Sequence, residues 1–139
     1  MRILLDTSAL YKRYALEGGS AQVQSVCEQA DGIVLAAHCM TEIASVFARH
    51  LHDGAISEAQ CQEALAMVTG DFSEFDVQPL NPTAERHTIE AMQRSRLQAM
   101  DALHIGTAQA AGVDLFVTAD REQAKAAKQA GLTVEMVIA

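Results

Sequence analysis

Short apolar runs alternate with longer amphipathic segments along this chain. The short runs lie at residues 2–5, 33–36, 76–78, 114–117 and 133–138, and we predict a strand at each. The segments between them have the lengths and apolar spacing of amphipathic helices. Alternation of strands with helices is typical of βαβ units, whose parallel strands are covered by helices on both faces. The pattern therefore predicts an α/β fold, a three-layer α/β/α sandwich around a central, mostly parallel five-stranded sheet.

Two of the predicted helices have clear start signals. Residues 57–60, Ser-Glu-Ala-Gln, have the spacing of a capping box, in which the first and last side chains bond to each other's backbone N–H. The Asn-Pro pair at 81–82 supplies an N-cap followed by a proline in the first helical turn. In that second helix the spacing places Ala84, Ile89 and Met92 on the inward face.

Nothing along the chain marks a boundary between domains. It has no linker rich in proline, glycine or serine and no internal repeat, so we expect a single domain over residues 1–139. No apolar stretch approaches the roughly 20 residues that span a bilayer. The cysteines, Cys27, Cys39 and Cys61, are not spaced as a disulfide framework. We therefore expect a soluble, cytoplasmic protein that does not enter a membrane.

Four acids lie where a predicted strand ends or a predicted helix begins. Asp6 ends the first apolar run, and Asp120 follows the strand predicted at 114–117. Glu42 opens the helix after the second strand, and Asp101 opens the helix that leads into the fourth. Because the carboxyl ends of parallel strands meet at one edge of a sheet, we expect the four carboxylates to face a common crevice.

Each acid also has a structural explanation of its own. The spacing from Asp120 to Gln123 is that of a capping box, and Asp6 and Asp101 each precede a helical run that they could cap. Glu42, in a first helical turn, would interact favourably with the helix dipole. Taken singly, each acid is better explained as a cap or a solvated side chain. The joint arrangement is what points to a functional site.

Carboxylates gathered in one crevice raise one another's pKa and repel unless a cation lies between them. Oxygen ligands favour Mg²⁺, with Mn²⁺ as a possible substitute, whereas Zn²⁺ prefers histidine and cysteine. One or two such ions can activate water for phosphodiester hydrolysis. Thr7, Ser8 and Thr118 are candidates to orient that water or a carboxylate, although a helix cap or a turn explains each hydroxyl equally well.

The formal net charge of −8 opposes nonspecific attraction to phosphate backbones. A nucleic-acid substrate would need local compensation, for which the candidates are Lys12, Arg13, Arg49, His50, His52, Arg86, Arg94, Arg96 and Arg121. We expect most of these to be ordinary solvated helix faces. The acidic balance also suits a basic partner.

At these acids the chain closely resembles the PIN domain, particularly the VapC-type toxins of bacterial toxin–antitoxin pairs. The resemblance rests on four segments, of which the third is the most specific: 5–10 (Leu-Asp-Thr-Ser-Ala-Leu), 41–43 (Thr-Glu-Ile), 101–108 (Asp-Ala-Leu-His, then Thr-Ala) and 118–121 (Thr-Ala-Asp-Arg). Two places depart from the family's usual pattern. Cys39-Met40 precede Thr41 where a serine is often found, and Gly106 stands where an alanine is common.

The resemblance implies a magnesium-dependent endoribonuclease with a PIN-like fold, whose metal ligands are Asp6, Glu42, Asp101 and Asp120. It also implies a homodimer that acts on RNA, and a cognate antitoxin whose carboxyl-terminal segment packs into a groove and often places an arginine at the acids. His104 lies three residues after Asp101 and fits a histidine that packs beside the site. We leave it out of the catalytic set.

Other functions stay open on the sequence alone. A noncatalytic binding module can share the fold, although the presence of all four acids argues against it. Small-molecule phosphatases and receiver-like domains also place an aspartate after a first strand. The segment after Asp6 lacks the second acid of the phosphatase DxDxT pattern, and the paired acids and lysine usual in receivers are not evident. Metal-dependent RNA cleavage is therefore the preferred hypothesis.

Overall fold

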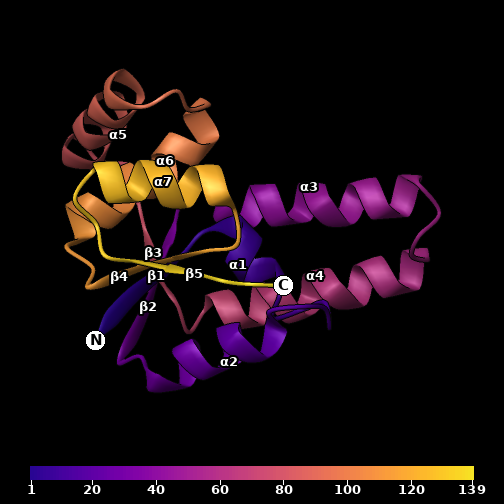
Figure 1. The fold of residues 1–139 in the computed structure, drawn as a ribbon. Helices are drawn as coiled ribbons and strands as arrows, with labels where there is room; N and C mark the ends of the chain where they lie inside the picture. The colour runs from indigo at the N-terminus through magenta and orange to yellow at the C-terminus, as the bar shows by residue number, and fades with distance from the viewer.

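The computed structural model describes residues 1–139, which form five strands and seven helices (Figure 1). The strands are β1 (Arg2–Leu5), β2 (Gly32–Ala36), β3 (Asp76–Gln78), β4 (Leu115–Thr118) and β5 (Val134–Met136). The helices are α1 (Thr7–Tyr11), α2 (Ser20–Gln29), α3 (Cys39–His52), α4 (Glu58–Phe72), α5 (Pro82–Arg94), α6 (Ala99–Ala111) and α7 (Arg121–Gln129). All five predicted strands are present, with small shifts at their ends. No helix combines the length and the hydropathy that crossing a bilayer requires.

The strands pair in parallel throughout, in the order β3-β2-β1-β4-β5. The chain builds outward on one side of β1, through β2 to β3, and then crosses to the other side for β4 and β5. Because the direction of winding changes beside β1, helices α1 and α7, which follow β1 and β4, pack on opposite faces of the sheet. Open α/β sheets bind their ligands at such a point, outside the carboxyl ends of the strands. The predicted sheet is confirmed, and it contains no antiparallel strand.

Alternate side chains of β1 face opposite sides of the sheet and enter two separate hydrophobic cores. Ile3 and Leu5 pack with residues of α1, α2, α3 and α4, whereas Leu4 packs with α5, α6 and α7. Figure 1 shows α5, α6 and α7 above the sheet and α2 and α4 below it. This arrangement is the predicted three-layer sandwich, and it explains why the first strand reads as an unbroken apolar run.

The start signals identified at two helices act as predicted. Ser57 accepts a hydrogen bond from the backbone N–H of Gln60, and the Gln60 side chain accepts one from the N–H of Ser57 at the start of α4. At the start of α5, Asn81 accepts from the N–H of Ala84, with proline in the first turn. Local capping therefore sets where these two helices begin.

The buried face of α5 is made of small side chains. Ala84, Thr88 and Ala91 are buried, whereas Ile89 is 45% exposed, so the prediction that it faces inward is wrong. Small residues are required because α6 approaches closely at Gly106. A Cβ at Gly106 would lie 2.0 Å from Thr88 Oγ1 and 2.7 Å from the carbonyl oxygen of Ala84. Hydrophobicity alone does not report such a constraint.

Replacing Gly106 with alanine is expected to destabilise the fold by about 1–3 kcal/mol, the usual range for overpacking a dense contact. Part of the clash is with the backbone of α5, so a rotamer change at Thr88 cannot relieve it. Urea denaturation followed by circular dichroism measures the change in the free energy of unfolding.

Gly70→Ala is the matched control. Gly70 also lies within a helix, α4, but a Cβ there would meet nothing within 4 Å. That substitution should stabilise the fold by up to about 1 kcal/mol, because alanine has the higher helix propensity. If the two alanines have the same effect, the close approach of α5 and α6 is not what constrains Gly106.

Candidate active site

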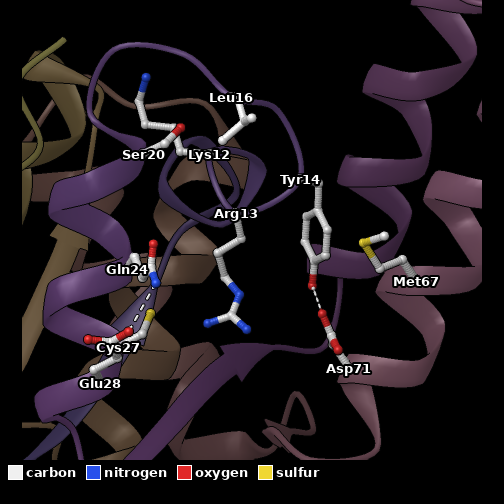
Figure 2. A pocket seen from close by; sticks show the side chains of 10 residues that line it. All are labelled: Lys12, Arg13, Tyr14, Leu16, Ser20, Gln24, Cys27, Glu28, Met67 and Asp71. Atoms are coloured by element: carbon white, nitrogen blue, oxygen red, sulfur yellow. Dashed lines mark hydrogen bonds between the residues drawn. The ribbon is translucent and has the colours of Figure 1, made fainter.

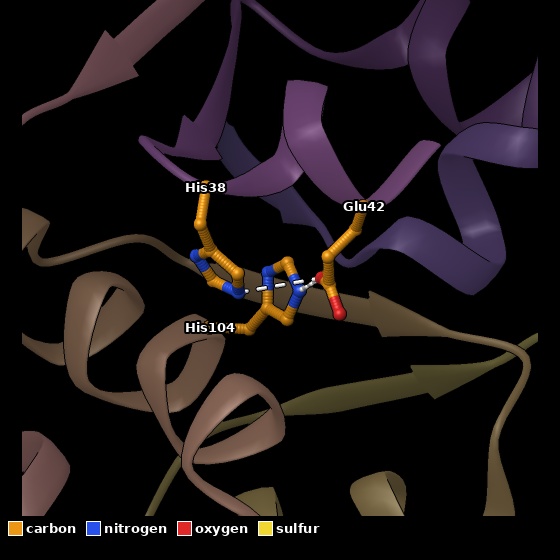
Figure 3. A group of neighbouring side chains, drawn as sticks. All are labelled: His38, Glu42 and His104. Carbon is orange, nitrogen blue, oxygen red and sulfur yellow. Dashed lines mark hydrogen bonds and ion pairs between the residues drawn. The ribbon is translucent and has the colours of Figure 1, made fainter. Parts of the chain in front are cut away.

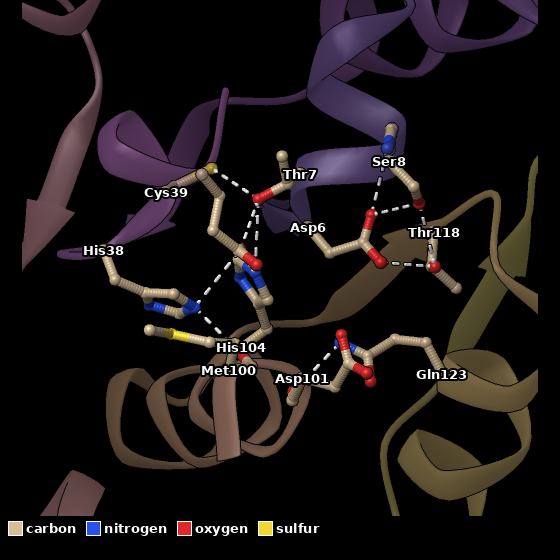
Figure 4. A network of polar contacts seen from close by, with 12 residues as sticks. Asp6, Thr7, Ser8, His38, Cys39, Met100, Asp101, His104, Thr118 and Gln123 are labelled. Atoms are coloured by element: carbon tan, nitrogen blue, oxygen red, sulfur yellow. Dashed lines mark hydrogen bonds and ion pairs between the residues drawn. The ribbon is translucent and has the colours of Figure 1, made fainter. Parts of the chain in front are cut away.

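Asp6 lies directly after β1, where the direction of winding changes. Its side chain is 3% exposed and caps α1 by accepting from the backbone N–H of Ala9 at 2.9 Å. Ser8 Oγ donates to the same carboxylate oxygen at 2.7 Å, and Thr118 Oγ1 at the end of β4 donates to the other (Figure 4). Residues from two neighbouring strand ends therefore hold the Asp6 carboxylate between them.

Burial raises the pKa of Asp6 above its ordinary value, although the charge of His104 and the hydrogen bonds from Thr118, Ser8 and Ala9 lower it. The hydrogen bonds to this carboxylate therefore do not fully compensate for the hydration that it loses on burial. A cation beside it would stabilise the ionised form.

Glu42 lies in the first turn of α3, as predicted. Three groups surround one of its oxygens, and two of them, His38 and His104, are drawn in Figure 3. Around Oε1, Thr7 Oγ1 lies at 2.7 Å, His104 Nε2 at 2.6 Å and His38 Nε2 at 3.3 Å. Burial raises the pKa of Glu42, but the hydrogen bonds from His104, His38 and Thr7 together outweigh it and hold the pKa well below its ordinary value. Glu42 is therefore a fixed anion whose second oxygen stays free.

The nitrogens of His38 and His104 lie within 4.8 Å of the Glu42 carboxylate and of each other, so the three could in principle hold a metal. The hydrogen bonds favour a different role. His38 Nε2 lies 2.8 Å from the carbonyl oxygen of Met100, an atom that only accepts, so this nitrogen carries a proton. His104 Nε2 faces a carboxylate, and its Nδ1 is buried without a partner, whereas metal-bound histidines normally donate through the second nitrogen. His104 therefore acts as a donor that orients Glu42, and the ring of His38, held by Met100, lies against the same carboxylate oxygen.

His38 was not identified from the sequence. It is the N-cap residue of α3 and precedes Glu42 by four residues. Side chains four residues apart on a helix lie on the same face, so this spacing was the available signal. His104, which the sequence analysis placed beside the site, comes from α6 and is 2% exposed.

Asp101 lies within the first turn of α6 and does not cap it. The helix begins at Ala99 after Gln98, so the interpretation of Asp101 as a cap is wrong. The buried Gln123 of α7 donates from Nε2 to the backbone carbonyl oxygen of Asp101 at 3.0 Å. This contact fixes the first turn of α6 against α7 and leaves the Asp101 side chain free.

The four acids are electrostatically coupled. Burial and then the negative charges of Asp120, Glu42 and Asp6 raise the pKa of Asp101 above its ordinary value, while His104 lowers it. Asp6, Glu42 and Asp120 therefore lie within electrostatic reach of Asp101. The ligand atoms that lie within 4.8 Å of one another are those of His38, Glu42 and His104, so the four carboxylates are near one another without already enclosing an ion. The raised pKa of Asp101 therefore reflects, besides burial, the negative charges of the other three acids.

Asp120 is exposed and caps α7, as predicted. Its Oδ1 accepts from the backbone N–H groups of Glu122 at 2.8 Å and Gln123 at 3.1 Å. Capping occupies only this oxygen, so a cap and a metal ligand are compatible roles for the same side chain. Because α7 begins here, its first turn stands beside the crevice.

Each of the four carboxylates has oxygen lone pairs that no protein donor occupies. The second oxygens of Glu42 and Asp120 have no protein donor, the Asp101 carboxylate has none on either oxygen, and Oδ2 of Asp6 accepts only from Thr118. An ionised carboxylate has about four lone-pair sites, so each acid can accept further. This all-oxygen donor set fits Mg²⁺ or Mn²⁺.

A cavity of about 370 Å³ opens elsewhere, where the carboxyl-terminal end of α1 faces α2 and α4 (Figure 2). None of the four acids lines it. Burial raises the pKa of the Cys27 thiol despite the nearby Arg13, and burial with the hydrogen bond to Asp71 raises the pKa of Tyr14. Its thiol and phenol therefore stay protonated at neutral pH and are poor nucleophiles. The acidic crevice is the better candidate for chemistry.

Comparison with known families decides which fold family this is. The sequence model of the PIN domain matches residues 3–129. The chain belongs to the PIN domain family. This confirms the resemblance that was drawn from the four acidic segments, and no curated protein sequence gives a significant match.

Solved structures of similar fold come from toxin–antitoxin systems. The structure of FitAB bound to an IR36 DNA fragment has a TM-score of 0.75 at 15% identity, covering 96% of this chain and 94% of that one. VapBC2 from Rickettsia felis, bound to a DNA fragment from its promoter, gives 0.71 at 14%, covering 98% of each chain. VapC20 of Mycobacterium tuberculosis, a toxin that cleaves the sarcin–ricin loop, gives 0.68 at 14%, covering 89% and 94%. At these identities the likeness establishes the fold.

Asp101→Asn is expected to raise the stability of the metal-free protein at neutral pH. The folded state raises the pKa of Asp101, so above the ordinary value of 3.8 the unfolded chain ionises first and the folded state loses stability as the pH rises. Asparagine removes the charge and with it that loss. Urea denaturation in EDTA at several pH values measures the gain, which should shrink as the pH falls towards 3.8.

Asp53→Asn serves as the matched control, because Asp53 is an exposed acid at the far end of α3. It should give no such pH-dependent gain. A loss of stability in Asp101→Asn at neutral pH, or a gain that does not change with pH, would contradict the crowding of charge in the crevice.

Proposed function

We propose that this protein is a Mg²⁺-dependent endoribonuclease and the toxin of a type II toxin–antitoxin pair. The observation that carries the proposal is the set of four coupled carboxylates at the carboxyl edge of a PIN-family sheet, each with a free oxygen position. The fold shared with VapC20, a toxin that cleaves the sarcin–ricin loop, supports RNA as the substrate class. The reaction is the hydrolysis of a phosphodiester bond by water.

Asp6, Glu42, Asp101 and Asp120 are the proposed ligands of the ion. When bound, the ion would activate a water and neutralise the charge that develops on the phosphate. The protein's own contribution is to place the carboxylates beforehand. Ser8 and Thr118 fix Asp6, and Thr7, His38 and His104 fix Glu42. Each of these donors binds one oxygen, so the carboxylates need little rearrangement when the ion enters.

We propose a cognate antitoxin and a second copy of the chain as protein partners. Several solved structures with this fold are toxin–antitoxin complexes, including one from Klebsiella pneumoniae and a DNA-bound VapBC from Salmonella typhimurium. The net charge of −8 and the acidic crevice favour an antitoxin segment that carries basic side chains. A basic side chain in the crevice would relieve the same repulsion that a metal ion relieves.

RNA end-mapping tests the proposed activity. The purified, antitoxin-free protein is incubated with total cellular RNA with and without Mg²⁺, beside Asp101→Asn and the control Asp53→Asn. We expect discrete new ends with the unmodified protein and with Asp53→Asn, only when Mg²⁺ is present. Asp101→Asn should lose at least about a hundredfold in cleavage, the scale on which loss of a group that stabilises transition-state charge is felt.

The outcome that contradicts this proposal is a folded, antitoxin-free protein that produces no Mg²⁺-dependent ends. New ends that persist unchanged in Asp101→Asn would instead remove that residue from the site. Total RNA is the appropriate substrate because it requires no assumption about which RNA is cut.

A further inference from the structure

Most basic side chains of this acidic chain are either engaged or scattered. Of the ten lysines and arginines, four already have a partner: Arg2 pairs with Asp76, Lys12 with Glu17 and Arg86 with Glu90, and Arg13 lies over the ring of Phe75. Of the others, Arg94, Arg96 and Lys125 line one pocket of about 230 Å³. We refer to it as the cation pocket.

The cation pocket lies between the segment that ends α5 and the outer face of α7. Arg94 and Arg96 form one wall, and Lys125 and Gln129 form the other. Ser95 Oγ contacts the Gln129 side chain and ties the two walls together. The pocket therefore holds its cations on two connected elements, so they are gathered before any ligand arrives.

The charge of the cation pocket is unbalanced. Three cationic side chains face a single carboxylate, that of Glu122, and none of the three cations forms an ion pair. Cations held close together repel one another, and together they attract an anion. In a chain whose net charge is −8, such a local excess of positive charge is a place that a phosphate group can approach.

The cation pocket and Asp120 share helix α7. Asp120 caps the amino-terminal end of α7, and Lys125 follows five residues later, roughly 7–8 Å along the helix axis. Between them, Gln123 donates to the backbone carbonyl oxygen of Asp101. The same short helix thus contributes to the crevice at one end and to the cation pocket along its side.

We propose that the cation pocket holds a backbone phosphate of the RNA strand, next to the bond that the acidic crevice cleaves. This proposal rests on the proposed function. A guanidinium matches a phosphate with two parallel hydrogen bonds, and Arg94 and Arg96 provide two such groups on one wall. Contacts to phosphate position a strand without reading its sequence. The pocket therefore compensates locally for the repulsion between an acidic protein and a polyanionic substrate.

Fluorescence anisotropy of a mixed-sequence, single-stranded RNA tests this inference, with Asp101→Asn as the background so that the RNA stays intact. Arg94→Ala, Arg96→Ala and Lys125→Ala are each added to that background and titrated over a series of salt concentrations. Each is expected to weaken binding at low salt and to reduce the slope of log K against log salt by roughly 0.7 for the phosphate contact that is lost.

Lys128→Ala is the matched control, because Lys128 is an exposed cation of α7 that does not line the pocket. It should leave the slope unchanged although it removes the same charge. Arg94→Lys, which keeps the charge, should retain most of the slope and lose part of the affinity. Thermal unfolding of every variant confirms that the fold is intact.

Equal slopes for the pocket variants and Lys128→Ala would overturn the inference, while RNA cleavage by the unmodified protein would still stand. A protein that neither binds nor cleaves RNA would instead overturn the proposed function beneath it. If the pocket substitutions spare RNA binding but abolish binding of a polyglutamate peptide, the pocket receives an acidic protein segment, and the assignment to RNA is wrong.

Discussion

Holding four negative charges together at one edge of a parallel sheet is the constraint on which this structure depends. The chain meets it with fixed donors. Hydroxyl and backbone N–H groups surround Asp6, two imidazoles and a hydroxyl converge on one oxygen of Glu42, and the start of α7 binds Asp120. Asp101 receives no donor, and burial together with the neighbouring negative charges raises its pKa. The site is therefore arranged for a cation to complete it.

The layers of the fold place these donors. Asp101 and His104 both come from α6, three residues apart, so the position of this one helix sets both the uncompensated acid and a donor to Glu42. Helix α6 is fixed on one side by its close approach to α5 at Gly106 and on another by the contact from Gln123. The departure from the family's usual alanine at Gly106 thus has a local cause, which is the close approach of the α5 backbone and of the Thr88 side chain.

The architecture could be predicted from sequence because it follows from strong local patterns. Apolar runs covered on both faces identify the strands, and side-chain caps identify the starts of α4, α5 and α7. Asp101 was wrongly interpreted as a helix cap because α6 starts after Gln98, whose side chain makes no capping hydrogen bond. Without that signal, the sequence does not show where the helix begins. The face of α5 was misassigned because close packing against Gly106 there outweighs hydrophobicity.

A common edge for the acids was to be expected from the parallel sheet, whereas the residues that hydrogen-bond to them were not. Strand ends in a parallel sheet share one edge, so Asp6 and Asp120 are expected at the same edge. The role of His38 depends on its being the N-cap residue of α3 and on the ring of His104 arriving from a helix distant in sequence. Such long-range convergence has no local pattern, so only the three-dimensional structure identifies it.

The central claim is that the coupled carboxylates form a site for a divalent cation. A titration with Mn²⁺ followed by electron paramagnetic resonance, with Mg²⁺ as competitor, tests it without reference to any substrate. We expect the unmodified protein and Asp53→Asn to bind Mn²⁺ equally, and Mg²⁺ to displace it. Asp101→Asn should bind Mn²⁺ at least about tenfold more weakly because one charge is gone. If the unmodified protein binds Mn²⁺ no better than Asp101→Asn, the acids do not form a metal site and the claim is wrong.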